Sequence, residues 1–90
     1  MEFEWDPKKA EINQKKHGVN FQEAASVFGD PLAVTFEDLD HSINEYRYIT
    51  FGLSFKKRLL VVSHADRDER TRIINARVME RKERQIYEKG

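Results

Sequence analysis

The sequence predicts an α+β protein in which a mostly antiparallel β-sheet carries two N-terminal helices and one C-terminal helix. Helix signals fill the first third of the chain, strand patterns with short turns follow, and a charged segment with helical spacing ends it. Strands grouped together with helices at their flanks are typical of the α+β class, because an α/β fold would alternate the two. The 90 residues contain no repeat or linker, so one domain, residues 1–90, is expected.

Two helices are predicted before the sheet. Asp6 followed by Pro7 favours a helix start, because Asp accepts hydrogen bonds from free N–H groups and Pro lacks the donor that would stay unpaired there. Gly18 suits the left-handed conformation that ends such a helix. Asn20 with Glu23 three residues later matches a capping box, which indicates that a second helix begins at once.

The remaining elements follow from apolar patterns bounded by polar turns. Two hairpins are expected, with turns at Ser54–Lys57 and Arg67–Glu69. Asn75 is expected to cap a final helix. The predicted strands are Phe3–Trp5, Leu32–Phe36, Glu45–Leu53, Arg58–His64 and Arg70–Asn75, and the predicted helix is Ala76–Glu88.

The composition excludes several classes of function. The chain has no Cys, which excludes disulfides, thiol catalysis and thiolate metal sites and agrees with a reducing cytoplasm. No apolar run approaches the roughly 20 residues that cross a bilayer, and the acidic start lacks the pattern of a secretion signal. Gly-rich phosphate loops, HExxH and nucleophile elbows are absent. We therefore expect a cytoplasmic protein with no cofactor and no membrane contact.

Charge is unevenly distributed along the chain, although the formal net charge is zero. Residues 1–55 hold five Lys/Arg and ten Asp/Glu, whereas residues 56–90 hold eleven Lys/Arg and six Asp/Glu. A basic second half favours contact with a polyanion. A solvated, Arg-rich helix explains the same charges, and charge alone does not separate the two interpretations.

The two hairpins predict a candidate site. With the turn Ser54–Lys57, Arg47 lies opposite His64, and with the turn Arg67–Glu69, His64 lies opposite Arg72. A neutral imidazole between two guanidiniums combines a proton acceptor with a phosphate-binding pair. RNA cleavage needs both, because the 2′-hydroxyl must lose a proton while negative charge develops at phosphorus. A strand-end His that is simply hydrogen-bonded within the structure is the other interpretation.

The last helix and an acidic loop offer further candidates. Arg77 lies where the last strand meets the helix, close to the predicted phosphate site, and Tyr87 offers a proton donor or a base-stacking ring. Both are also explained as ordinary residues of a charged helix. His41 with Asp38 and Asp40 has the donors of a Mg²⁺ or Mn²⁺ site, but a flexible acidic loop without metal is the favoured interpretation.

Two strings of residues match a known family pattern, from about residue 3 to residue 88. In combination they resemble the BrnT family of bacterial toxins, with Asn75 standing where Ser is common; both residues can cap a helix. The matching residues are Phe3-Glu4-Trp5-Asp6-Pro7, Lys9-Ala10, Asn13, Lys16-His17-Gly18-Val19, Phe21, Ala24, Phe28, Arg72-Ile73-Ile74-Asn75-Ala76-Arg77, Glu83-Arg84 and Tyr87.

The resemblance implies a RelE-like fold and ribonuclease activity in a type II toxin–antitoxin system. It also implies neutralisation by a BrnA-like antitoxin protein, with operator DNA bound only through the antitoxin complex. We assign His64 or Glu45 as the base and the arginines to the phosphate. The candidate catalytic residues are Glu45, Arg47, His64, Arg72, Arg77 and Tyr87.

The predicted function is metal-independent endoribonuclease activity by 2′-hydroxyl attack, which inhibits translation by cutting free or ribosome-associated RNA. The expected assembly is a homodimer or a toxin–antitoxin heterotetramer. The alternative function is a non-catalytic RNA- or protein-binding module of the same fold.

Overall fold

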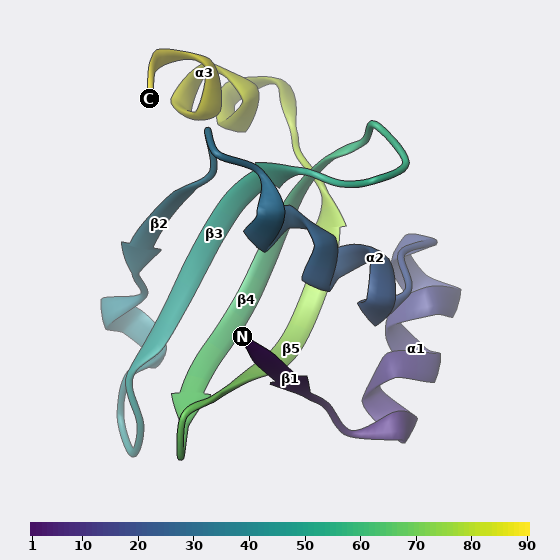
Figure 1. Ribbon diagram of the computed structural model, residues 1–90, viewed down its shortest axis with the longest axis vertical. Helices are drawn as coiled ribbons and strands as arrows, with labels where there is room; N and C mark the ends of the chain where they lie inside the picture. The colour runs from purple at the N-terminus through teal and green to yellow at the C-terminus, as the bar shows by residue number, and fades with distance from the viewer.

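The computed structural model describes residues 1–90 and confirms the α+β class. Five strands form one sheet in the order β1-β5-β4-β3-β2, in which only the β1–β5 pair is parallel (Figure 1). No helix is long and apolar enough to cross a membrane. The elements are β1 (Glu2–Glu4), α1 (Pro7–His17), α2 (Phe21–Ser26), β2 (Val34–Glu37), β3 (Arg47–Leu53), β4 (Leu59–Arg67), β5 (Arg70–Val78) and α3 (Arg81–Lys89), with 3₁₀ turns at Val27–Gly29 and Leu39–His41.

The first two helices begin where the sequence predicts. The Asp6 side chain accepts a hydrogen bond from the Lys8 N–H, Pro7 opens α1, and Gly18 (φ 69°) ends it in the left-handed conformation. Asn20 caps α2, because its side-chain oxygen accepts a hydrogen bond of 2.7 Å from the backbone of the third helical residue. Short polar capping residues replace the partners that the first N–H groups of a helix lack.

The Glu23 carboxylate does not complete the predicted capping box but binds inside the protein. It is fully buried and accepts hydrogen bonds from Ser54 Oγ at 2.7 Å and from Arg58 Nε at 2.9 Å. Arg58 Nη2 contacts the second carboxylate oxygen. The hydrogen bond from Arg58 is the main reason that the pKa of Glu23 lies below its usual value. This ion pair ties α2 to the turn between β3 and β4.

The same ion pair explains why the first hairpin is one residue out of the predicted register. The turn has five residues, Ser54–Arg58, so Leu53 lies opposite Leu59 and not opposite Arg58. The Arg58 guanidinium is occupied by Glu23, which holds this residue in the turn. Local apolar pattern does not contain this tertiary contact, and a one-residue change moves each side chain to a new partner.

The second hairpin also differs from its prediction. A two-residue turn replaces the predicted turn Arg67–Glu69, because Asp68 (φ 49°) and Glu69 (φ 67°) both adopt the left-handed conformation. Two left-handed residues match the twist of hairpin strands. As a result, Ala65 lies opposite Arg72, where the sequence placed His64.

β5 is longer than predicted, and the prediction of a helix from Ala76 with Asn75 as its cap is wrong. The strand continues to Val78, and α3 begins at Arg81. Ala76 is fully buried, and its backbone N–H and C=O bind the side-chain amide of Asn13 at 3.0 and 2.8 Å. Asn13 thereby takes the place of a strand partner along the part of β5 that β1 does not reach.

Replacing Asn13 with alanine is expected to lower the free energy of unfolding by about 2 kcal/mol, because buried backbone groups of Ala76 and Val19 lose their partners. Urea denaturation followed by circular dichroism measures the change. Gln14→Ala, on the exposed side of the same helix, is the matched control and should leave the midpoint nearly unchanged. Equal midpoints for both variants would contradict this role of Asn13.

The two faces of the sheet are covered unequally. α1, α2 and the 3₁₀ turn after α2 cover one face, and α3 lies across one end of the molecule (Figure 1). On the second face, Phe51, Val61 and Met79 form a small buried cluster, against which Tyr87 of α3 packs. The remainder of that face carries no helix. The larger core cluster on the first face comprises Val19, Phe21, Ala24, Val27, Leu60, Val62, Ile73 and Ala76.

Candidate functional site

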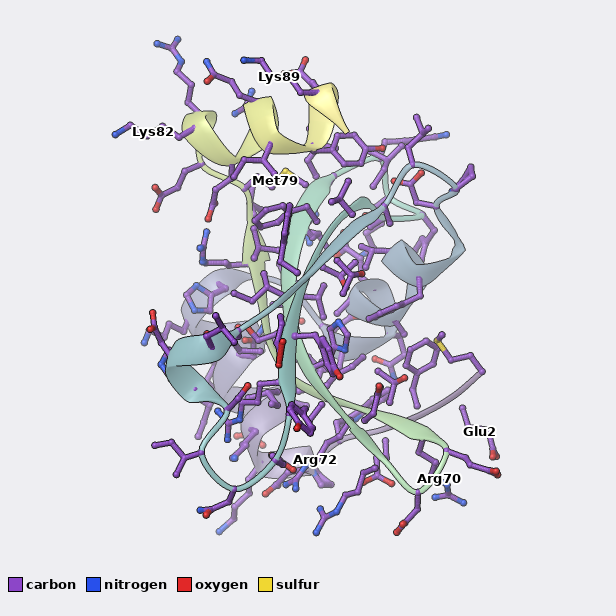
Figure 2. All side chains as sticks on the ribbon, turned by 90° about the vertical axis from the view of Figure 1, so that its left-hand side faces the viewer. Glu2, Arg70, Arg72, Met79, Lys82 and Lys89 are labelled. Atoms are coloured by element: carbon purple, nitrogen blue, oxygen red, sulfur yellow. The ribbon has the colours of Figure 1, made fainter.

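The part of the second face that no helix covers presents polar and cationic side chains, and we call it the open face. Arg47, Ala65 and Arg72 lie in one row across β3, β4 and β5. Paired residues of neighbouring strands point to the same face of a sheet. In Figure 2, Arg72 lies toward the opposite end of the molecule from Met79 and α3. The open face is formed by Arg47, Ser63, Arg72, Ile74 and Asn75.

The predicted row of Arg47, His64 and Arg72 is therefore wrong in its central residue. His64 pairs with Tyr48 and Ile73, so it lies on the face that the helices cover. The two register errors have the same direction, which keeps the two arginines in one row while Ala65 replaces the imidazole.

His64 has the surroundings of a structural histidine. The residue is 5% exposed, its Nε2 lies 2.7 Å from Thr50 Oγ1, and its ring packs edge-on against Phe28 at 4.8 Å. Burial lowers the pKa of His64 to about 4, an effect that outweighs the attraction of Asp66. The ring is neutral as the sequence predicts, but the cause is burial and not the neighbouring arginines.

Among the predicted cationic residues, Arg47 is the one best placed to bind a phosphate. It begins β3, its side chain is 36% exposed, and its Nε is buried without a hydrogen-bond partner. Glu45 lies in the loop before β3, not in the strand as predicted, and its Oε1 is 3.6 Å from this Nε. A guanidinium whose donors are only partly used can still bind an anion.

Arg72 is half-buried and separated from Arg47 only by the small side chain of Ala65. Neighbouring strands lie about 4.8 Å apart, so the two arginine backbones are separated by roughly 10 Å. Two long, flexible guanidiniums across this gap can approach one phosphodiester from both sides.

Arg77 and Tyr87, by contrast, are engaged in holding α3. Arg77 donates two hydrogen bonds of 2.7 Å to the Glu83 carboxylate, and these lower the pKa of Glu83. The Tyr87 hydroxyl donates a hydrogen bond of 2.7 Å to Asp30, which raises the pKa of Tyr87 to about 12. Neither group is free to meet a ligand while α3 keeps this position.

Replacing Tyr87 with phenylalanine is expected to loosen α3 by about 1 kcal/mol, because one hydrogen bond to Asp30 is lost while Asp30 keeps its backbone partners Leu32 and Leu53. Native-state hydrogen exchange should show faster exchange in α3 and unchanged exchange in β4. Tyr46→Phe is the control, since the Tyr46 ring is exposed. Unchanged α3 protection would refute this contact as an anchor.

Two hollows lie beside the loop of residues 38–46, and His41 and Arg47 line both of them. The smaller hollow, of about 90 Å³, opens onto the open face and is lined by Asp38, His41, Arg47, Ser63, Ile74 and Asn75. The larger one, of about 370 Å³, is lined by Asp40, His41, Ile43, Asn44, Glu45 and Arg47.

His41 is a residue whose place beside the candidate site the sequence does not predict, and it lines both hollows together with Arg47. Its Nδ1 lies 2.9 Å from Asp38 Oδ2, and its side chain is 66% exposed. The spacing Asp-x-x-His is the available signal, but by itself it indicates only a metal site or an acidic loop. No group of three or more His, Cys, Asp or Glu side chains is arranged to hold a metal ion.

The comparison with protein families identifies the family. The family model described as "Ribonuclease toxin, BrnT, of type II toxin-antitoxin system" matches residues 5–83. The chain belongs to the BrnT toxin family. It is therefore a ribonuclease toxin of the BrnT type, from a type II toxin–antitoxin system. Among curated proteins, none matches the sequence.

A solved BrnT structure confirms the fold. The 1.1 Å crystal structure of the Brucella abortus ribonuclease toxin BrnT matches with a TM-score of 0.70 and 20% sequence identity, covering 90% of this chain and 99% of that chain. In the present chain, the residues that match the family model include Glu45, Arg47, Arg72 and Arg77, and the match ends before Tyr87.

Proposed function

We propose that this BrnT toxin cleaves RNA on the open face, without a metal ion, by attack of the 2′-hydroxyl on the adjacent phosphodiester. The observation that carries the proposal is the row of Arg47 and Arg72 on either side of Ala65. Arginine binds phosphate through paired N–H groups, and its charge persists at every physiological pH.

The largest requirement of the reaction is stabilisation of the negative charge that develops on the phosphate. As the 2′-oxygen approaches phosphorus, negative charge accumulates on the two non-bridging oxygens. Fixed donors aimed at such charge commonly contribute the largest part of catalysis. Arg47 and Arg72 are proposed in this role. Arg77 lies opposite Val61, five residues along β5 and roughly 16 Å from Arg72, so it joins them only when its contact with Glu83 opens and α3 moves.

The partners follow from the family. We propose that a BrnA-like antitoxin binds and neutralises this toxin, that the pair forms a heterotetramer or the toxin a homodimer, and that operator DNA is bound only through the antitoxin. Cleavage of free or ribosome-associated RNA in the cytoplasm would inhibit translation. The uneven charge, with acidic residues 1–55 and basic residues 56–90, supports a surface that attracts RNA.

The experiment is an RNA cleavage assay with purified protein in the presence of EDTA. The expected products carry a 2′,3′-cyclic phosphate or a 3′-phosphate, and the double variant Arg47→Ala/Arg72→Ala should produce none. In cells, expression of the toxin alone should arrest growth, and a BrnA-like antitoxin should relieve it. Activity that EDTA abolishes would contradict the metal-independent mechanism, and RNA binding without any cleavage would favour the non-catalytic alternative.

A further inference from the structure

The loop of residues 38–46 is fixed against the start of β3 by two hydrogen bonds, and a third lies within the loop. The Asp38 N–H donates to the Arg47 C=O at 2.7 Å, and the Arg47 N–H donates to Ser42 Oγ at 3.0 Å. The Ser42 hydroxyl in turn donates to the Asp38 C=O at 2.6 Å. Asp38 and Arg47 are therefore held side by side, although nine positions separate them in the sequence.

Asp38 also determines which nitrogen of the neutral His41 ring carries the proton. Its carboxylate lies 2.9 Å from Nδ1, and a carboxylate only accepts hydrogen bonds. The proton of the neutral ring therefore sits on Nδ1, and Nε2 is left with its lone pair free. The Asp38 side chain is only 14% exposed, so its carboxylate is largely shielded from water, whereas the His41 side chain is 66% exposed and accessible to a ligand. His41 lines the small hollow on the open face together with Arg47, Ser63 and Asn75.

We propose that His41 is the general base of the cleavage reaction and that Asp38 is the residue that positions it. This inference rests on the proposed function. His41 Nε2 takes the proton of the 2′-hydroxyl, the 2′-oxygen forms a bond to phosphorus, and the bond from phosphorus to the 5′-oxygen breaks. The departing 5′-oxygen takes a proton from water, and the product is a 2′,3′-cyclic phosphate. Arg47, which lines the same two hollows as His41, faces the phosphate on which negative charge develops.

The other two candidate bases are less suitable. Glu45 lies 3.6 Å from Arg47 and is engaged in an ion pair with it. His64 is buried against the helices and cannot reach RNA on the open face. The titratable and charged groups around His41 are Asp38, Asp40, Glu45 and Arg47.

The test compares two exposed or half-exposed histidines of the full chain in the RNA cleavage assay. His41→Gln should lower kcat about 10²–10⁴-fold, the range for loss of a general base. Binding of a 2′-O-methylated RNA, which cannot be cut, should be unchanged. His17→Gln, at the end of α1, should cleave like the wild type. Thermal melts check that both variants fold.

Two further variants separate catalysis from structure. Added imidazole should restore part of the cleavage activity of the His41→Ala variant, because free imidazole can occupy the space that the His41 side chain leaves. Asp38→Asn should lower kcat without weakening binding of the 2′-O-methylated RNA. The control Asp68→Asn, in the β4–β5 turn, should keep the wild-type kcat.

The outcomes distinguish this inference from the proposed function. If the wild type cleaves RNA, Arg47→Ala does not, and His41→Gln keeps the wild-type kcat, then His41 is not the base and the proposed function stands. A wild type that cuts no RNA would overturn both.

Discussion

Replacing Arg47 with alanine is expected to slow RNA cleavage by the purified toxin about 10²–10³-fold, the loss typical when one charge-stabilising donor is removed. The Arg47 side chain is half-buried on the open face, its Nε has no hydrogen-bond partner, and its ion-pair partner Glu45 lies 3.6 Å from that Nε. Its donors are therefore available to a phosphate whose charge grows in the transition state. Single-turnover cleavage at saturating protein measures the effect on the chemical step.

Two control variants make this prediction specific. Arg47→Lys keeps the charge but loses the planar pair of donors, so it should recover only part of the rate. Lys15→Ala removes one exposed cation from α1, on the other side of the sheet, and should leave the rate unchanged. An equal loss in Arg47→Ala and Lys15→Ala would mean that only total charge matters, and the site assignment would be wrong.

The second large effect concerns stability in mild acid. The pKa of His64 is lowered from 6.5 to about 4 because the buried ring resists a charge. The unfolded chain binds a proton near pH 6.5 and the folded protein does not, so this stability is complete above pH 6.5 and is lost as the pH falls toward 4. At about 1.4 kcal/mol per pH unit, the free energy of unfolding should decrease by about 3 kcal/mol over this range.

Urea denaturation at several pH values between 7 and about 4.5 tests this linkage. His64→Gln cannot titrate, so its stability should change much less over the same range. Acidic groups with lowered pKa contribute a separate loss at lower pH, because each carboxylate's stabilising effect disappears only below its ordinary pKa. Parallel pH profiles for the wild type and His64→Gln would contradict the prediction. These acidic groups are Glu23, Asp30 and Glu83.

The elements that could be predicted from the sequence are those specified locally. Asp6-Pro7, Gly18 and Asn20 act through hydrogen bonds and backbone conformations within a few residues, and the structure confirms all three. The start of α3 could not be predicted in this way. Ala76 favours a helix by itself, but its contact with Asn13, far away in the sequence, keeps it in a strand.

The two arginines of the candidate site could be predicted from the sequence, but the histidine that accompanies them could not. The basic second half of the chain and the pairing of three strands were enough to bring Arg47 and Arg72 into one row. The prediction of His64 between them failed because turn length depends on the buried Glu23–Arg58 pair. The position of His41 depends on hydrogen bonds across a loop, which no periodic pattern shows.

The most direct test of the central claim, that RNA binds the open face, is a map of backbone amide chemical shifts. The labelled toxin is titrated with a 2′-O-methylated form of an RNA that the wild type cleaves. The shifts that change should cluster at Arg47, Ser63, Arg72, Asn75 and the loop of residues 38–46. Changes concentrated on α1 and α2, with the open face silent, would contradict it.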